Sequence, residues 1–208
     1  MGNGQVKAIW EKLISRYTSN LQGDELWKEL EKAYTSEERS YHTLHHLGYM
    51  LQLAEQYKPE IKHFDALRFA IFYHDIIYHP AAKDNEEKSA ELAMVALNSA
   101  GVKPEELELI RKMIRATKEH QEHRNKDINL LLDFDLAILG TEWDKYDTYR
   151  KQVRIEYKHF PDAVFNHGRK QVLQSFLAQP SIFKTPQFEV EREAKARENL
   201  TREIYLLQ

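Results

Sequence analysis

The stretch DALRFAIFYHDIIY, residues 65–78, decides the fold that this chain is expected to adopt. Its hydrophobic residues cover most sides of a helix, and a helix of that kind usually lies at the centre of a bundle. Pro80 follows the stretch and is expected to end the helix, because proline cannot continue the helical hydrogen bonds. The stretch therefore predicts a buried central helix that other helices must surround.

The rest of the chain supplies helices for such a bundle. Apolar residues recur three and four positions apart from Val6 to Tyr17, and Asp24 is expected to cap a second helix. Gly101 is expected to close a later helix, and Asp127 to cap another. The same spacing predicts helices over about residues 42–57, 84–100, 104–120, 127–140 and 141–159, and a last one after Pro186.

Composition also favours helices. The 208 residues include only 7 Gly and 6 Pro, too few for the many turns of an all-β protein, whereas the helix formers Leu, Glu, Lys, Ala, Arg and Gln dominate. Hydrophobic residues make up 42% of the chain, which is enough for a sizeable core, and the length suits one domain. We therefore predict an all-α, single-domain helical bundle over residues 1–208.

Charge and cysteine content exclude several classes of protein. The net charge of −3 leaves no basic excess for nucleic acid and no polybasic arm for a membrane. No apolar run approaches the ~20 residues of a membrane span, and the N-terminus lacks the apolar core of a signal peptide. Without cysteine, disulfides and thiolate metal sites are excluded. We expect a cytoplasmic protein that binds neither nucleic acid nor membrane, and its apolar helices could pack across a homodimer as easily as within one chain.

Three polar clusters interrupt the apolar segments: YHTLHH at residues 41–46, FYHDII at 72–77 and LLLDFDLAIL at 130–139. In the first cluster His42 and His46 are four positions apart, so on a helix they would share one face and could address one site. Pairs of surface histidines are also common. The first cluster alone therefore does not decide between a functional site and a solvated face.

The second cluster places His74 and Asp75 inside the most apolar predicted helix. Burying an ionised carboxylate there costs roughly several kcal/mol unless a cation or a full set of hydrogen bonds compensates. Either one side chain reaches solvent while the other finds a partner in the core, or a metal cation compensates both. In the third cluster Asp133 and Asp135 are two positions apart, so at most one of them faces a given site.

Together the clusters offer neutral imidazoles and carboxylates without any thiolate. Such nitrogen and oxygen ligands suit Mn, Fe, Co, Ni, Zn or, less well, Mg. Because each cluster lies in an otherwise apolar helix, one buried site accounts for all three. We therefore predict one bound divalent metal ion, whose identity the residue types leave open.

The order His46, His74-Asp75, Asp135 resembles the H…HD…D signature of the HD superfamily, whose members are helical bundles that bind divalent metals and mostly hydrolyse phosphate esters. YHTLHH also resembles the Tyr-His-Asn-x-x-His stretch of the cyclic-nucleotide phosphodiesterases in that superfamily. The whole sequence resembles a bacterial group described as predicted metal-dependent HD phosphohydrolases. The signature-bearing core covers about residues 39–140, and the helical extension over 141–208 matches that group alone.

The resemblance implies a metal-dependent phosphohydrolase that acts on a small phosphate ester, with a nucleotide as the substrate that the superfamily favours. It implies His46, His74, Asp75 and Asp135 as the metal ligands, with Asp135 chosen over Asp133 because an Asp precedes Leu-Ala in the family pattern. Asp75 would also orient the attacking water. His42, the first histidine of the phosphodiesterase-like stretch, would donate a proton to the leaving oxygen.

The sequence departs from the family pattern in two places, and these departures limit which residue roles can be transferred from the family to this chain. The four residues after Asp75 are Ile-Ile-Tyr-His, without the Glu that helps to activate water in the HD nucleotidases. No second His-rich motif clearly completes a two-metal site, although His120, or Glu86 within the segment 84–89, could hold a second ion or simply lie at a solvated helix end. Arg39 and Lys118 flank two of the clusters and are candidate partners of the phosphate. The candidate substrate-binding residues are therefore Arg39, Lys118, His120 and Glu86.

Two other functions stay open from the sequence. A sensor domain of the HD fold could keep the metal ligands and bind a nucleotide without turnover, and the missing Glu favours that reading slightly. A purely structural helical protein with incidental histidines would bind no stoichiometric metal. The presence of His42 argues for an enzyme.

Overall fold

The computed structural model describes residues 1–207, and every regular element among them is helical. The chain divides into two compact units, Met1–Leu131 and Leu132–Gln208. The all-α prediction is confirmed, whereas a single domain over the whole chain stays a prediction. Among the described residues no helix has the length and apolar character that a membrane crossing requires.

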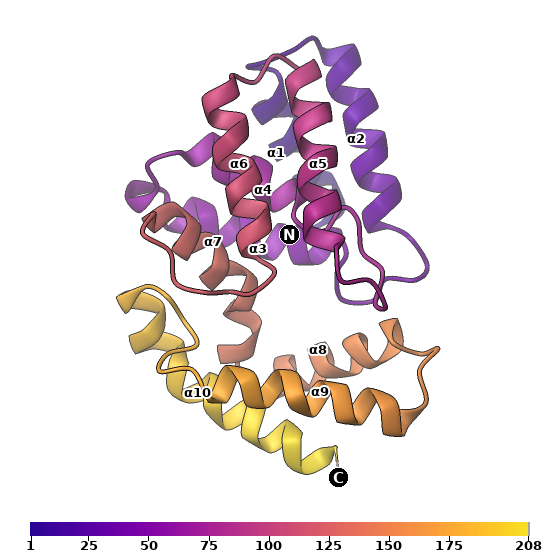
Figure 1. The fold of residues 1–208 in the computed structure, drawn as a ribbon. Helices are drawn as coiled ribbons and strands as arrows, with labels where there is room; N and C mark the ends of the chain where they lie inside the picture. Colours follow the sequence, from indigo (N-terminus) through magenta and orange to yellow (C-terminus); the bar gives the residue numbers. More distant parts are fainter. Residues whose placement is uncertain (208) are drawn as a thin grey trace. The chain divides into compact units, whose positions relative to one another are not determined.

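The first unit is built around α4 (Phe64–Tyr73) (Figure 1). Every residue of α4 from Ala66 to Tyr73 is buried, and the helix packs against its neighbours α3, α5 and α6. The ring of Trp10 on α1 meets that of Phe72 edge-on, with the ring centroids 5.1 Å apart. The predicted central helix is therefore confirmed. The other elements of this unit are α1 (Asn3–Ile14), α2 (Asn20–Tyr34), α3 (Leu44–Gln56), the 3-10 turn η1 (Lys58–Glu60), α5 (Asn85–Ser99) and α6 (Pro104–Ala116).

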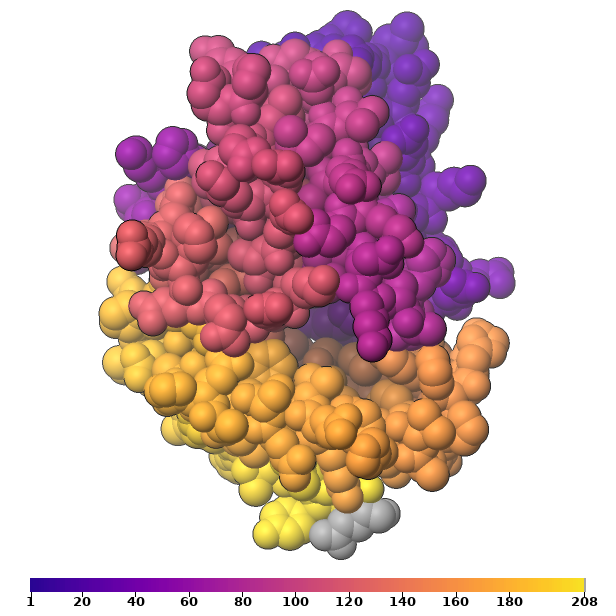
Figure 2. Space-filling view, in the orientation of Figure 1, coloured from indigo at the N-terminus to yellow at the C-terminus, as the bar shows by residue number. Residues whose placement is uncertain are grey.

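Two adjacent helices close one face of the first unit. Figure 2 shows the side chains of α5 and α6 packed into a continuous surface there. As predicted, α5 ends at a glycine, since Gly101 has a φ of +84° that other residues rarely adopt, and α6 begins with Pro104. The predicted end of α6 near His120 was too late, because the helix stops at Ala116.

The central helix ends earlier than the sequence indicated, at Tyr73 rather than Tyr78. Two side chains of α5 bind the backbone after Tyr73, and their hydrogen bonds take the place of those that a continuing helix would make. The hydroxyl of Ser89 accepts a hydrogen bond from the amide of Ile77 at 3.1 Å and donates one to its carbonyl at 3.3 Å. The amide side chain of Asn85 pairs in the same way with the amide and carbonyl of His79, at 3.1 and 3.0 Å.

Two predicted helix caps, Asp24 and Asp127, were also wrong, and the helix predicted from about residue 42 begins at Leu44. Ser19, not Asp24, caps α2, and Asp24 lies inside that helix. Thr43 caps α3 by accepting a hydrogen bond from the amide of His45 at 3.3 Å, which leaves His42 outside the helix.

The helix α7 (Lys126–Leu136) does not use Asp127 as its cap. Instead the side chain of Asn125 accepts a hydrogen bond from the Asp127 amide at 2.9 Å. The Asp127 carboxylate faces the other way and accepts hydrogen bonds from the amides of Lys62 and His63, at 2.9 and 2.8 Å. Asp127 therefore anchors the segment that leads into α4. The boundary between the two units falls within α7.

The second unit comprises the end of α7, the 3-10 turn η2 (Ala137–Gly140), α8 (Trp143–Glu156), α9 (Asp162–Leu177) and α10 (Pro186–Leu206). The helix α10 lies against η2 at Gly140, where an added Cβ would come within 2.5 Å of the Cβ of Arg192. The sequence did not predict α9. Only two of its residues, Phe165 and Leu173, are buried, so its apolar pattern is too sparse to indicate a helix.

Candidate metal centre

Two helix ends bring the predicted ligands of the first unit together. His46 lies in the first turn of α3, His74 directly follows the last residue of α4, and Asp75 comes next. Because α3 packs against α4, the start of one helix meets the end of the other. Each of the three residues offers one ligand atom, and these atoms all lie within 4.8 Å of one another. The structure thus gathers three of the four predicted ligands into one cluster.

The cluster combines buried imidazoles with a more accessible carboxylate. His46 and His74 are 2% and 1% exposed, and their ring centroids lie 5.4 Å apart. The side chain of Asp75 is 15% exposed, and its Oδ2 lies 3.2 Å from Nε2 of His74. Adjacent ligands of one ion stand about 3 Å apart when the metal–ligand bonds are ~2.1 Å long. The spacing of these two atoms therefore suits a shared metal ion.

The tautomer of His74 is fixed by its other nitrogen. Nδ1 lies 2.9 Å from the carbonyl oxygen of Ile71, and because a carbonyl can only accept, Nδ1 must carry a proton. In the neutral ring the lone pair of Nε2 then faces the carboxylate of Asp75. A cation between the two atoms, or a second proton on the ring, stabilises this arrangement. A backbone partner on the far nitrogen is also the usual way in which proteins orient a metal-binding histidine.

His42 reaches the same carboxylate from a different segment. Its Nε2 lies 3.9 Å from Oδ2 of Asp75, and its side chain is 20% exposed. The prediction that His42 and His46 share a helix face was wrong, because His42 precedes the cap of α3. The ring nevertheless lies 5.8 Å from that of His46, and it stacks on the ring of Tyr78 with centroids 4.3 Å apart and an interplanar angle of 32°.

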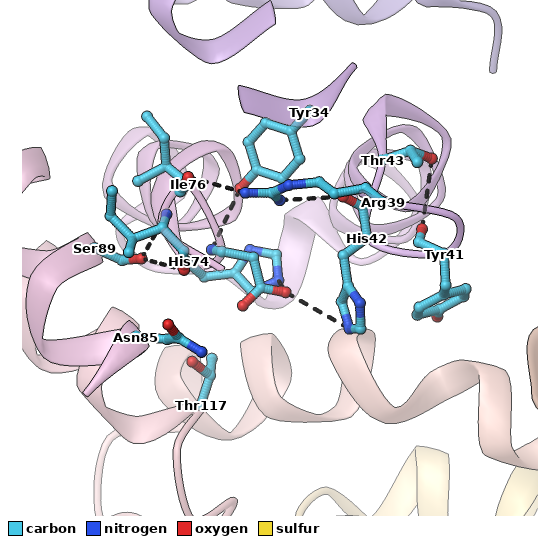
Figure 3. A network of polar contacts seen from close by, with 12 residues as sticks. Tyr34, Arg39, Tyr41, His42, Thr43, His74, Ile76, Asn85, Ser89 and Thr117 are labelled. Carbon is cyan, nitrogen blue, oxygen red and sulfur yellow. Dashed lines mark hydrogen bonds and ion pairs between the residues drawn. The ribbon is translucent and has the colours of Figure 1, made fainter. Parts of the chain in front are cut away.

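The backbone after His74 is held by side chains for which the sequence predicted no such role, including Arg39, which it offered as a partner of the phosphate. The hydroxyl of Tyr34 accepts a hydrogen bond from the amide of Asp75 at 3.3 Å, and Arg39 donates to the carbonyl of Ile76 at 2.9 Å (Figure 3). Ser89 and Asn85 bind the residues that follow, as described above. The sequence held one sign of this role: Asn85 and Ser89 are polar residues four positions apart, on the face of α5 that otherwise buries alanines.

The four predicted substrate-binding residues stay outside the three-residue cluster. Lys118 is exposed beyond the end of α6, and Glu86 is half-buried in the first turn of α5. His120 adopts a left-handed conformation with a φ of +49°, and its amide bonds the carbonyl of Ala116 at 3.2 Å, so it terminates α6. Arg39 uses its guanidinium to bind backbone carbonyls. Among residues 1–207, one group of three or more potential ligands is close enough to share an ion, and neither His120 nor Glu86, which could have held a second ion, belongs to it.

Asp133 and Asp135 both lie in the second unit, on α7. Asp133 is fully buried, and its carboxylate accepts hydrogen bonds from the amides of Lys184 and Thr185, at 2.6 and 2.8 Å, and from the Thr185 hydroxyl at 2.6 Å. Burial raises its pKa to about 6, although these hydrogen bonds act in the opposite direction. Asp133 thus anchors the loop before α10. Asp135 is half-buried, and its role as the fourth ligand stays a prediction.

Comparisons with protein-family models, with curated proteins and with solved structures found no match. The chemistry of the site therefore has to be argued from its own residues. Two imidazoles and a carboxylate form a donor set that fits a first-row divalent ion, and three protein ligands would leave coordination positions for water and substrate.

Proposed function

We propose that this chain is a metal-dependent phosphohydrolase of the HD type, which acts on a phosphate ester such as a nucleotide or a related small molecule. One observation carries the proposal. His46, His74 and Asp75 converge within 4.8 Å, and His42 approaches the same oxygen of Asp75 that faces His74. A purely structural cluster would not require a further, partly exposed histidine near the same carboxylate oxygen.

His46, His74 and Asp75 would hold the divalent ion, with Asp135 proposed as a fourth ligand. When bound, such an ion lowers the pKa of a coordinated water toward ~7 and offsets the charge that builds on the phosphoryl oxygens. The bond from Nδ1 of His74 to the Ile71 carbonyl keeps its Nε2 directed at the site. His46, almost fully buried in the first turn of α3, has little freedom to leave it.

Asp75 and His42 would move the protons of the reaction. The carboxylate of Asp75, which is partly exposed, would accept a hydrogen bond from the attacking water and orient it toward phosphorus. Nε2 of His42 would carry a proton and donate it to the leaving oxygen of the ester, which contributes about 10²–10⁴ in rate. Stacking on Tyr78 limits the rotation of the His42 ring and keeps Nε2 near the carboxylate.

The proposal is tested by hydrolysis of a panel of phosphate mono- and diesters, nucleotides included, with Mn²⁺, Co²⁺, Ni²⁺ or Mg²⁺ added to the apoprotein. Wild type is compared with His74→Ala and with His45→Ala, since His45 is an exposed neighbour of the cluster. We expect metal-dependent hydrolysis that is lost in His74→Ala and kept in His45→Ala. Metal binding without turnover of any ester would instead favour a non-catalytic sensor domain, and hydrolysis that survives in His74→Ala would refute the assigned centre.

A further inference from the structure

Arg39 makes four contacts that join the two sides of the candidate centre. Its Nη1 donates to the carbonyl of His42 at 3.1 Å, and its Nη2 donates to the carbonyl of Ile76 at 2.9 Å (Figure 3). The guanidinium also lies over the rings of Tyr34 and Tyr78, 4.7 and 5.5 Å from their centroids. One side chain thus connects the segment before α3 with the segment after α4.

The two aromatic rings beneath Arg39 have their own links to the centre. Tyr34 accepts a hydrogen bond from the amide of Asp75, and Tyr78 stacks on the ring of His42. Arg39 therefore binds the backbone of His42 directly and covers two rings, one of which contacts the amide of Asp75 and the other the ring of His42. Its position is that of a brace between the two residues.

We propose that Arg39 is a positioning residue that sets the separation between His42 and Asp75, rather than a ligand of the substrate phosphate. The inference rests on the proposed function, because it assigns the spacing of the two residues that the reaction would use. The planar fork of an arginine can donate to two carbonyls at once while its face covers a ring. Lysine keeps the charge but has one nitrogen, so it cannot hold both carbonyls in the same geometry.

The second unit offers a matched control in Arg154. Its Nη1 donates to the carbonyl of Tyr157 at 2.8 Å, its Nη2 donates to that of Phe160 at 3.1 Å, and the guanidinium lies 4.8 Å from the centroid of the Phe165 ring. Arg154→Lys therefore removes the same two kinds of contact as Arg39→Lys, in the unit that does not contain the cluster, and it also alters the ion pair that Arg154 forms with the exposed Asp162 at 2.5 Å. Arg154→Lys therefore shows how far the loss of such contacts alone, away from the candidate centre, changes the His42 signals.

The first measurement uses the 208-residue chain without metal, labelled at the histidine rings and kept at one pH. Because the ring of Tyr78 stacks on His42, its ring current displaces the His42 signals, which are assigned with His42→Asn. We expect Arg39→Lys to move these signals toward the position of the exposed His45, and Arg154→Lys to leave them unchanged. Unmoved His42 signals in folded Arg39→Lys would overturn the inference.

The second measurement separates the brace from a phosphate ligand. With hydrolysis established for wild type, we expect Arg39→Lys to lower kcat by about 10–100-fold, the range typical of residues that orient a metal centre from outside it, with KM and inhibition by inorganic phosphate nearly unchanged. A raised KM and weaker inhibition by phosphate, with kcat preserved, would contradict the brace. If wild type hydrolyses no ester while the His42 signals still move in Arg39→Lys, the proposed function fails and the positioning role stands.

Discussion

Asp75 and Asp133 both follow long apolar runs, and each belongs to a different unit of the chain. Asp133 is fully buried and receives three hydrogen bonds from Lys184 and Thr185, so its carboxylate is satisfied by donors of the protein itself. Asp75 is partly exposed and instead faces two imidazole nitrogens, at 3.2 and 3.9 Å. The difference teaches that the partners of a carboxylate separate two roles: Asp133, satisfied by donors of the protein, anchors a loop, whereas Asp75, which faces imidazoles, is the candidate metal ligand.

The largest effect that separates the two carboxylates is expected in hydrolysis. Asp75→Asn removes the charge of the proposed ligand while keeping the size of the side chain. We expect at least about a 10³-fold loss of metal-dependent hydrolysis, because the proposed ion would supply several kcal/mol of transition-state stabilisation. Asp133→Asn is expected to retain hydrolysis while folded. Initial rates of both variants at saturating metal would check this. Equal losses in both would remove the distinction.

A second effect concerns His42, which would act on the reaction without holding the ion. We expect His42→Asn to lower kcat by about 10²–10⁴-fold, as loss of a general acid does, while the apparent affinity for Mn²⁺ stays within a few fold. The affinity can be measured by calorimetry on the apoprotein, with His45→Asn as the exposed control. Loss of Mn²⁺ binding in His42→Asn would make His42 a ligand rather than a proton donor.

A third effect is the pH dependence of stability that Asp133 confers. Burial raises its pKa from 3.8 to about 6, so between these values the folded chain binds the proton that the unfolded chain has released. This contribution therefore stabilises the fold as the pH falls through 6 toward 4, and it is lost as the pH rises through 6. At ~1.4 kcal/mol per pH unit, the full effect is about 3 kcal/mol.

Urea unfolding at several pH values, for wild type and Asp133→Asn, measures that contribution as the difference between the two free energies of unfolding. We expect the difference to shift in favour of wild type between pH 7 and 4. A difference that does not change with pH would show that Asp133 keeps an ordinary pKa in the fold.

The smallest effect is expected at Ser89, which supports the segment after Asp75. Ser89→Ala leaves the amide of Ile77 without its hydroxyl partner, so we expect the free energy of unfolding to fall by about 1–2 kcal/mol. The control is Ser175→Ala, since Ser175 is exposed and bonds only the carbonyl of Val172 within its own helix. Urea unfolding of both variants checks the difference, and an equal, negligible change in both would argue against a supporting role for Ser89.

Local sequence patterns predicted much of the fold. The dense apolar run at 65–78 predicted the central helix, although not its end, and Gly101 and Pro104 marked a helix end and a helix start, because each signal acts within a few residues. The early end of α4 could not be predicted, since it depends on side chains of α5 that reach it through the tertiary fold. The helix α9 was missed because it buries too few residues to show a period.

The candidate centre was predictable in its residue types and less so in its geometry. His46, His74 and Asp75 stood out as polar residues in apolar surroundings, and the structure brings them together. Helical spacing gave the wrong account of His42, which approaches the cluster from the segment before α3. The bracing contacts of Arg39 could not be anticipated, because they join segments that are 37 positions apart in the chain.

The most direct test of the candidate centre is the metal content of wild type, Asp75→Asn and Asp133→Asn. Each protein is incubated with Mn²⁺, Co²⁺, Ni²⁺ or Zn²⁺, freed of excess ion and measured by elemental analysis beside a circular dichroism spectrum that confirms folding. We predict about one ion per chain in wild type and in Asp133→Asn, and little or none in Asp75→Asn. Folded wild type that retains no ion, or Asp75→Asn that retains as much as wild type, would contradict the account.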